Sequence, residues 1–284
     1  MKIILYIAFE LVLFCSCLFP NDKDDRNMIY GVTIDDISNI DDIVKSLSKL
    51  SKPVTTRIVF DKLRLPSFYL EAVNKIHNTG FIMGELLDSY CFADYTVLQY
   101  DDRVKKYLDA FGRKVDIWEI GNEINGEWLG NTDTIVRKIT NAFRIVKDEG
   151  KVTAITLYYN NDCCEKPENE MFRWINSNIP GNMKDSLDYV FVSYYEDDCN
   201  DFQPDWQSVF DSLHVIFPNS KLGIGECGTK FTKRKKSYIE RYYNMNISTP
   251  NFVGGYFWWY YKQDCVPYTK KLWKVLNSIL EKMD

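Results

Sequence analysis

The sequence is poor in the residues that bind transition metals. It has only two histidines, His77 and His214, both in stretches with helical spacing and far from any cysteine cluster. No Cys-x-x-Cys pair occurs. Zinc sites are built from closely spaced cysteine and histidine ligands, so a zinc site is not expected and no cofactor is predicted.

An excess of positive charge is also missing. The 35 lysines and arginines are outnumbered by 40 aspartates and glutamates, which gives a formal net charge of −5. Nucleic-acid binding needs a basic surface, so a nucleic-acid partner is not predicted. The one basic run, residues 230–236, is expected to open a solvated helix.

The chain lacks a glycine-rich phosphate turn. No G-x-G-x-x-G sequence follows the first strand-like run, which argues against an open dinucleotide-binding sheet. After residue 27 there is also no linker, repeat or low-complexity block. Residues 28–284 are therefore predicted to form one catalytic domain, and we expect a monomer.

The N-terminus has the pattern of an export signal. Lys2 gives a positive start, and residues 3–19 are almost wholly apolar, although Glu10 interrupts them. This run is too short to span a bilayer comfortably. We predict a signal peptide over residues 1–17 and a polar tether over residues 18–27.

The end of that signal resembles a relaxed bacterial lipobox, with Ser16 as the small residue before Cys17. A lipidated Cys17 would attach the protein to a membrane, at the cell surface or in the periplasm. A plain secretory signal is the second interpretation, and a buried N-terminal helix is the third.

What the chain does contain is a regular series of β-rich runs, separated by stretches with helical spacing such as residues 40–50 and 135–146. Alternating strands and helices build a parallel sheet, and eight strands close a (β/α)8 barrel of typically about 250 residues. The predicted fold class is therefore α/β, a (β/α)8 TIM barrel. Its expected strands are residues 28–35, 53–61, 81–89, 115–123, 153–160, 189–196, 221–229 and 253–261.

Two glutamates stand at the ends of such runs. Glu123 closes the fourth run, and Glu226 lies near the end of the seventh. A carboxylate at the end of a buried strand loses hydration without an assured partner, so its presence there needs a reason. In a barrel of this type the active site lies where the strands run into the following loops. We therefore expect both glutamates to line one site.

These segments also carry a family resemblance. Trp-Glu-Ile-Gly-Asn-Glu at residues 118–123 and Gly225-Glu226 resemble the signature of clan A, the large clan of retaining glycoside hydrolases on (β/α)8 barrels. In that clan an Asn-Glu pair ends strand four and supplies the acid/base, and a glutamate ending strand seven is the nucleophile. The resemblance implies a glycosidase that cleaves O-glycosidic bonds of a poly- or oligosaccharide.

The resemblance assigns a different role to each glutamate. Glu226 would attack the anomeric carbon, while Glu123 would protonate the leaving oxygen and then activate water; the two carboxyls lie about 5 Å apart in retaining enzymes. Asn122 would bind the sugar 2-hydroxyl. Arg57 would hold Glu226 ionised through a charge-assisted hydrogen bond.

Aromatic residues at the strand ends complete the predicted site. A tyrosine ending strand six would donate to Glu226; Tyr195 is the first choice and Tyr194 the alternative register. Trp258 or Trp259 would form the stacking floor for the sugar, in keeping with an aromatic content of 15%.

Other strand-end residues have more ordinary expected roles. Glu119 is expected to be an ion-pair partner in the core, with Arg57 as the candidate, whereas Glu85 and Glu196 should line the cleft or face solvent. Five cysteines fall in predicted loops at the catalytic end, and one or two disulfides are expected there, for instance one of Cys163 and Cys164 with Cys199. The five are Cys91, Cys163, Cys164, Cys199 and Cys265.

Two alternatives to a glycosidase stay open. The first is a catalytically inactive, carbohydrate-binding barrel on the cell surface. The second is a barrel enzyme of other chemistry, such as an aldolase, for which Lys62 and Lys230 lie just beyond strand ends.

Overall fold

The computed structural model describes residues 27–161 and 163–283, and its centre is a closed barrel of eight parallel strands that follow one another in chain order. The predicted (β/α)8 fold is confirmed. Each strand begins near its predicted start and ends before its predicted end. The strands are β1 (Ile29–Ile34), β2 (Thr55–Val59), β3 (Phe81–Glu85), β4 (Ile117–Glu119), β5 (Thr153–Tyr158), β6 (Tyr189–Tyr194), β7 (Lys221–Cys227) and β8 (Phe252–Trp258).

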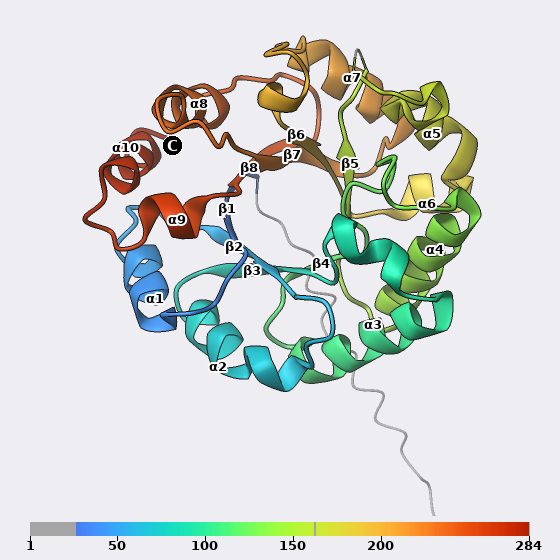
Figure 1. The fold of residues 1–284 in the computed structure, drawn as a ribbon, viewed down its shortest axis with the longest axis horizontal. Coiled ribbons are helices and arrows are strands. Elements are labelled where there is room, and N and C mark those ends of the chain that lie inside the picture. Colours follow the sequence, from blue (N-terminus) through green and yellow to red (C-terminus); the bar gives the residue numbers. More distant parts are fainter. Residues whose placement is uncertain (1–26, 162, 284) are drawn as a thin grey trace, which may run out of the picture.

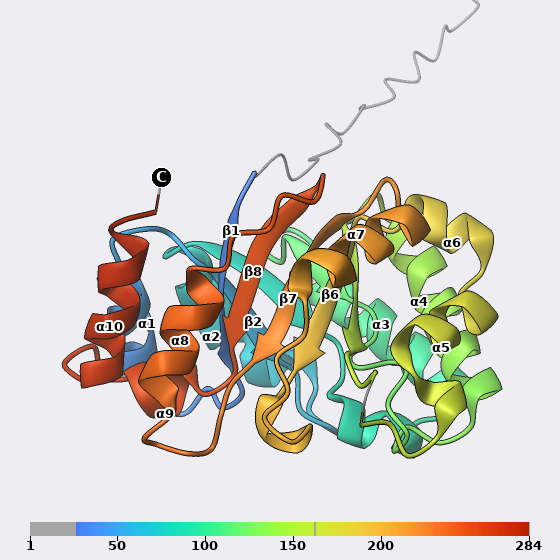
Figure 2. The same cartoon turned by 90° about the horizontal axis from the view of Figure 1, so that it is seen from above.

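Helices surround the barrel as a ring (Figure 1), and in the side view the arrowheads of β6 and β7 point toward the same end of the molecule (Figure 2). The α-helices are α1 (Ile40–Ser48), α2 (Pro66–His77), α3 (Val97–Phe111), α4 (Thr132–Asp148), α5 (Met171–Asn178), α6 (Gly181–Ser186), α7 (Trp206–Ile216), α8 (Lys235–Tyr243), α9 (Tyr261–Cys265) and α10 (Lys271–Leu280). Short 3-10 helices are η1 (Ser89–Asp94), η2 (Pro167–Asn169) and η3 (Glu196–Asp198).

The predicted signal peptide and most of the tether, Cys17 included, lie outside the described residues. Within the described part of the chain, no helix is both long and apolar enough to cross a membrane.

The barrel interior changes character along its axis. Side chains alternate between the two faces of a strand, and near the strand starts the inward positions are apolar, with Met83, Ile117 and Phe191 packed in one cluster. Two residues further along their strands stand Glu85, Glu119 and Ser193, all buried. The two-residue alternation of the strands therefore fills the lower part of the barrel with apolar side chains and places polar side chains near the strand ends.

A β-bulge in β7 aims Glu226 into the barrel. Val192 of β6 pairs with Ile224, but the next residue, Ser193, pairs with Glu226, so Gly225 is an extra residue on β7. One extra residue reverses the alternation of the strand. A side chain at Gly225 would have its Cβ 2.5 Å from the Cβ of Phe191, so only glycine fits the bulge.

Irregularities in β8 decide which of its two tryptophans faces the site. The register shifts against both neighbouring strands, and Gly254, Gly255 and Tyr256 all have positive φ. As a result Phe257 points into the barrel, whereas Trp258 packs fully buried in the layer between sheet and helices. The prediction of Trp258 as an alternative stacking floor is wrong, because its ring has no open face.

One disulfide joins two loops at the catalytic end. Cys163, after β5, is bonded to Cys199, after β6, with the two Cα atoms 5.4 Å apart. The predicted pairing is confirmed. The expectation of a loop position is wrong for Cys265, which is buried at the end of α9, and Cys91 lies in η1.

The basic run is only partly as expected. Of residues 230–236, Lys235 and Lys236 belong to α8, and Lys236 is exposed. Lys235 is instead buried, and its ammonium group lies 2.6 Å from Asp264. The helix is therefore not solvated on that side.

Candidate active site

The two glutamates lie in one polar site at the carboxyl ends of the strands. Ser193 donates a hydrogen bond of 2.6 Å to Oε1 of Glu123, and its register partner on β7 is Glu226. Neighbouring strands are about 4.8 Å apart, so Ser193 links the surroundings of the two carboxyls. Both glutamates are buried.

Arg57 occupies the centre of the site and is fully buried. Its Nε and Nη2 donate to the two oxygens of Glu119, at 2.7 and 3.0 Å, and its Nη1 donates to Oε2 of Glu226 at 2.7 Å. A bidentate contact fixes the plane of the guanidinium. Glu119 is thus the core partner that the sequence predicted, and it orients Arg57 toward Glu226.

A third carboxyl, Glu85, lies beside the same guanidinium, 3.1 Å from Nη2 of Arg57. The sequence-based expectation that it lines the cleft or faces solvent is wrong, since its side chain is fully buried. Neither oxygen has a hydrogen-bond partner among the described residues. Burial, reinforced by the nearby Glu119 charge, raises the pKa of Glu85 well above its ordinary value. A protonated Glu85 reduces the negative charge around Arg57.

Glu226 has two donors with different charges. Besides the contact with Arg57, it accepts a hydrogen bond of 2.6 Å from the Tyr195 hydroxyl to Oε1. Tyr194 points the other way and donates to the carbonyl of Phe202. Of the two registers left open by the sequence, the structure therefore brings Tyr195 to Glu226.

Glu123 lies beyond β4 in an unusual backbone conformation, with φ of 48°. The left-handed region costs a non-glycine residue about 1 to 2 kcal/mol. The conformation lets its carboxyl meet two neutral hydroxyls, Ser193 at Oε1 and Ser89 at Oε2, the latter at 2.8 Å. Ser89 in turn accepts the indole N–H of Trp128 at 3.1 Å.

Burial is the largest effect on the pKa of both carboxyls. It raises the pKa of Glu123 above its ordinary value, and it raises the pKa of Glu226 to about 8. The Glu123 charge adds to the rise at Glu226, whereas Arg57 and Tyr195 lower that pKa. Two carboxyls that influence each other in this way titrate as a pair. Arg57 favours the negative charge on Glu226.

The remaining predicted residues also lie at this end of the barrel. Asn122 is buried, and its Oδ1 has no hydrogen-bond partner among the described residues. A buried amide oxygen without a donor is costly, so a bound molecule with a hydroxyl would satisfy it. Trp259 is half-buried, and its ring lies 5.7 Å from Cζ of Arg57. Its face is next to the Arg57–Glu226 pair.

Sequence reasoning missed three residues of the site, namely Ser89, Ser193 and Trp128. Ser89 is the last residue of the predicted third strand and Ser193 lies near the end of the predicted sixth, and this position is the only signal that could have singled them out. Trp128 lies in the loop between β4 and α4 and carries no such signal. Glu196 was predicted to line the cleft or face solvent, but it is buried and paired with Arg241 at 2.8 Å.

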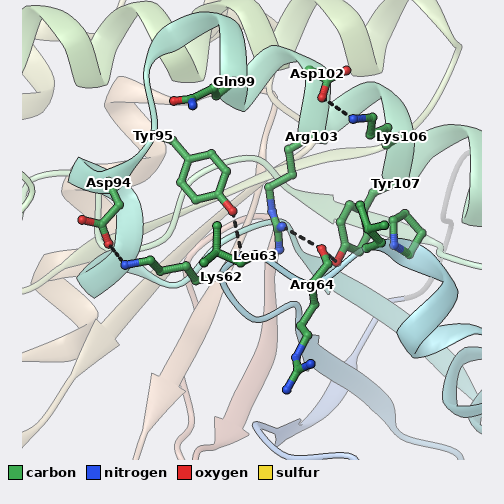
Figure 3. A pocket seen from close by; sticks show the side chains of 12 residues that line it. Lys62, Leu63, Arg64, Asp94, Tyr95, Gln99, Asp102, Arg103, Lys106 and Tyr107 are labelled. Atoms are coloured by element: carbon green, nitrogen blue, oxygen red, sulfur yellow. Dashed lines mark hydrogen bonds and ion pairs between the residues drawn. The ribbon is translucent and has the colours of Figure 1, made fainter.

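A separate cavity of about 270 Å³ lies beside the loops after β2 and β3 and against α3 (Figure 3). None of the residues that line it contacts Glu123 or Glu226. Its charged side chains are largely paired: Lys62 with Asp94, and Lys106 with Asp102. Lys62 is thus bound in an exposed ion pair, and Lys230 is exposed. Neither lysine has a contact that places it in the site, as a Schiff-base mechanism would need.

No protein-family model and no curated protein sequence matches the chain. Solved structures do match it. A β-glucosidase from Exiguobacterium marinum superposes with a TM-score of 0.52 at 13% identity, over 78% of this chain and 76% of that chain. Saccharomyces cerevisiae Gas2p in complex with laminaritriose and laminaritetraose gives a TM-score of 0.54 at 14% identity, over 90% of this chain but only 65% of that chain. The chain therefore shares the (β/α)8 barrel of these structures, which is the fold that the clan resemblance implies.

Proposed function

We propose that this protein is a retaining glycoside hydrolase that acts on a poly- or oligosaccharide. The observation that carries the proposal is the unequal setting of the two glutamates. Glu226 accepts from a cation and a phenol, whereas Glu123 accepts from two neutral serine hydroxyls. Such a difference is what separates a nucleophile from a general acid in one site.

In the first step Glu226 attacks the anomeric carbon, and the bond from that carbon to the leaving oxygen breaks. Glu123 gives its proton to the leaving oxygen, so the leaving group departs as a neutral alcohol. Arg57 and Tyr195 lower the pKa of Glu226, which favours its ionised form, and they fix its direction of attack. The product of the step is an ester between the sugar and Glu226.

In the second step Glu123, now ionised, takes a proton from water as the water oxygen attacks the anomeric carbon. The ester bond breaks and returns the charge to Glu226. Asn122 supplies its unpaired Oδ1 to the sugar 2-hydroxyl, and Trp259 offers a stacking face. Export, with lipid attachment at Cys17, belongs to the same proposal, since it would bring the enzyme to polysaccharides outside the cell.

Turnover by the purified protein tests the proposal. Aryl glycosides and a polysaccharide panel should be screened, with β-glucosides and laminarin oligosaccharides first, because the solved structures of similar fold include β-glucosidases and a laminari-oligosaccharide complex. We expect release of reducing sugar, and an initial product with the anomeric configuration of the substrate. Binding of sugars without turnover would support the inactive-barrel alternative instead.

The pH dependence offers a more specific prediction. Tyr195→Phe removes a hydrogen bond that lowers the pKa of Glu226, so that pKa rises further. Activity needs ionised Glu226, and the acidic limb of the kcat/KM profile should therefore move to higher pH. We also expect kcat/KM to fall by about 10- to 100-fold, the worth of one hydrogen bond to a charged group.

Tyr194→Phe is the matched control, because this neighbouring hydroxyl donates to the Phe202 carbonyl and not to Glu226. Its removal should leave the acidic limb in place. An unshifted limb in Tyr195→Phe, or an equal shift in both variants, would contradict the assigned role.

A further inference from the structure

Three aromatic side chains gather on the Glu123 side of the site. Tyr90, in η1, is 79% exposed. Its ring stacks on that of Trp128, with centroids 5.7 Å apart and planes inclined by 20°. Trp128 in turn meets Tyr158 edge-on at 5.3 Å. Tyr90 therefore has one face on Trp128 and its other face open to solvent.

This aromatic stack is connected directly to the proposed acid. The indole N–H of Trp128 donates to Ser89, the residue before Tyr90, and Ser89 donates to Glu123. Ser89 thus helps to position both the Trp128 ring, on which Tyr90 stacks, and the Glu123 carboxyl. Burial raises the pKa of Tyr90 and of Tyr158, and the Glu123 charge adds to both rises.

Another aromatic residue, Trp259, lies on the Glu226 side of the site, where its ring packs over Arg57. The Tyr90–Trp128 stack and Trp259 therefore flank different members of the carboxyl pair. In a retaining mechanism the sugar under attack lies at the nucleophile, and the leaving group lies at the acid that protonates it. Tyr90 consequently lies on the side of the site where the leaving group would bind.

A carboxylate lies on the same side of the site as the exposed ring of Tyr90. Asp198, in η3, is exposed, and its charge also acts on Tyr90 and Tyr158. A flat apolar face with a nearby carboxylate suits a pyranose, which has an apolar face of C–H groups and a rim of hydroxyls.

We infer that Tyr90, seated on Trp128, is the binding platform for the leaving sugar and, once that sugar has left, for a sugar acceptor. The inference rests on the proposed function and narrows its substrate class to saccharides that carry a sugar unit on the leaving side. With a bound acceptor, the acceptor hydroxyl gives its proton to Glu123 as its oxygen bonds to the anomeric carbon. The ester to Glu226 breaks, and the result is glycosyl transfer in place of hydrolysis.

The test compares two donors with the same glycosyl group, an oligosaccharide and a glycosyl fluoride, because fluoride is too small to reach the platform. We expect Tyr90→Ala to lower kcat/KM on the oligosaccharide by about tenfold, the loss of one aromatic contact. The loss on the fluoride should be much smaller. Transfer to added oligosaccharide, measured as the ratio of transfer product to hydrolysis product, should fall to a similar extent.

Tyr90→Phe keeps the ring and should behave like the unmodified protein. Phe68→Ala, an exposed aromatic of α2 outside the site, is the control for loss of any surface ring and should change neither donor. Equal losses on both donors, or no loss on the oligosaccharide, would overturn the platform. If the unmodified protein turns over neither donor, the proposed function itself fails.

Discussion

Glu226→Gln is expected to lower kcat/KM on an activated aryl glycoside by about 10⁴-fold or more. Glutamine keeps the size of the side chain and a partner for Arg57, but its amide oxygen is too weak a nucleophile to form the glycosyl ester. The measurement is steady-state hydrolysis, with trapping of a covalent intermediate on the unmodified protein. Glu196→Gln is the matched control, since Glu196 is also buried and paired with an arginine, Arg241, but does not contact the pair.

The same substitution should not destabilise the fold. Burial raises the pKa of Glu226 from 4.5 to about 8, so between these pH values the folded chain keeps a proton that the unfolded chain releases. Stability from this group is therefore lost as pH rises through that window. Glutamine does not titrate, and we expect Tm of Glu226→Gln at pH 7 to equal or exceed that of the unmodified protein. A lower Tm together with full activity would refute the assignment of Glu226.

Loss of activity without loss of stability is the mark of a residue selected for chemistry. Glu119→Gln should lower Tm as well as activity, because this carboxylate holds both Nε and Nη2 of the buried Arg57, which in turn contacts Glu226. Removing one partner of a buried ion pair leaves the other uncompensated. Glu119 and Glu226 contact the same guanidinium. Comparing the two variants therefore distinguishes a carboxylate that positions Arg57 from one that reacts with the substrate.

The sequence predicted the barrel well because its eight apolar runs are separated by stretches of helical period. Eight alternating strands and helices are the number that closes a (β/α)8 barrel. It also predicted the contacts of Arg57 with Glu119 and Glu226. The contact with Glu119 follows from strand order and strand alternation, which can be counted along the chain, whereas the contact with Glu226 also needs the bulge in β7.

Features that depend on backbone irregularity could not be predicted. Simple alternation along β7 would have turned Glu226 outward, and only the bulge at Gly225 restores it. Alternation along β8 places Trp258 and Trp259 on opposite faces but does not say which of them faces the site, and three successive residues with positive φ place Trp258 in the helix layer. Glycines occur at both irregularities, the bulge in β7 and the register shift in β8. The presence of a glycine does not, however, predict the direction in which a strand bends.

Burial depth was the other quantity that the sequence did not contain. Glu85 and Glu196 are polar residues at strand ends, where solvent or a cleft is the usual surrounding. Each is instead covered and has an arginine partner, Arg57 for Glu85 and Arg241 for Glu196. Those partners are 28 and 45 residues away in the chain, so the pairing follows from the closed barrel and from no local pattern.

Glu123→Gln should produce a loss that depends on the leaving group. For an oligosaccharide, whose leaving oxygen needs a proton, we expect kcat/KM to fall by about 10²- to 10⁴-fold, the usual worth of general acid catalysis. For a dinitrophenyl glycoside, whose leaving group departs without a proton, formation of the glycosyl ester should change little. The ester should then accumulate, because water lacks its general base, and an added small anion such as azide should release it as the glycosyl azide.

The pH profile of this variant gives an independent measurement. Glutamine is uncharged, like the protonated Glu123 of the reactive form, in which Glu226 is ionised. The acidic limb, which reports ionisation of Glu226, should therefore stay in place, in contrast to the shift expected for Tyr195→Phe. The basic limb should disappear, since no general acid remains to lose its proton. Equal losses for good and poor leaving groups, with the basic limb unmoved, would show that Glu123 supports the site without transferring the proton.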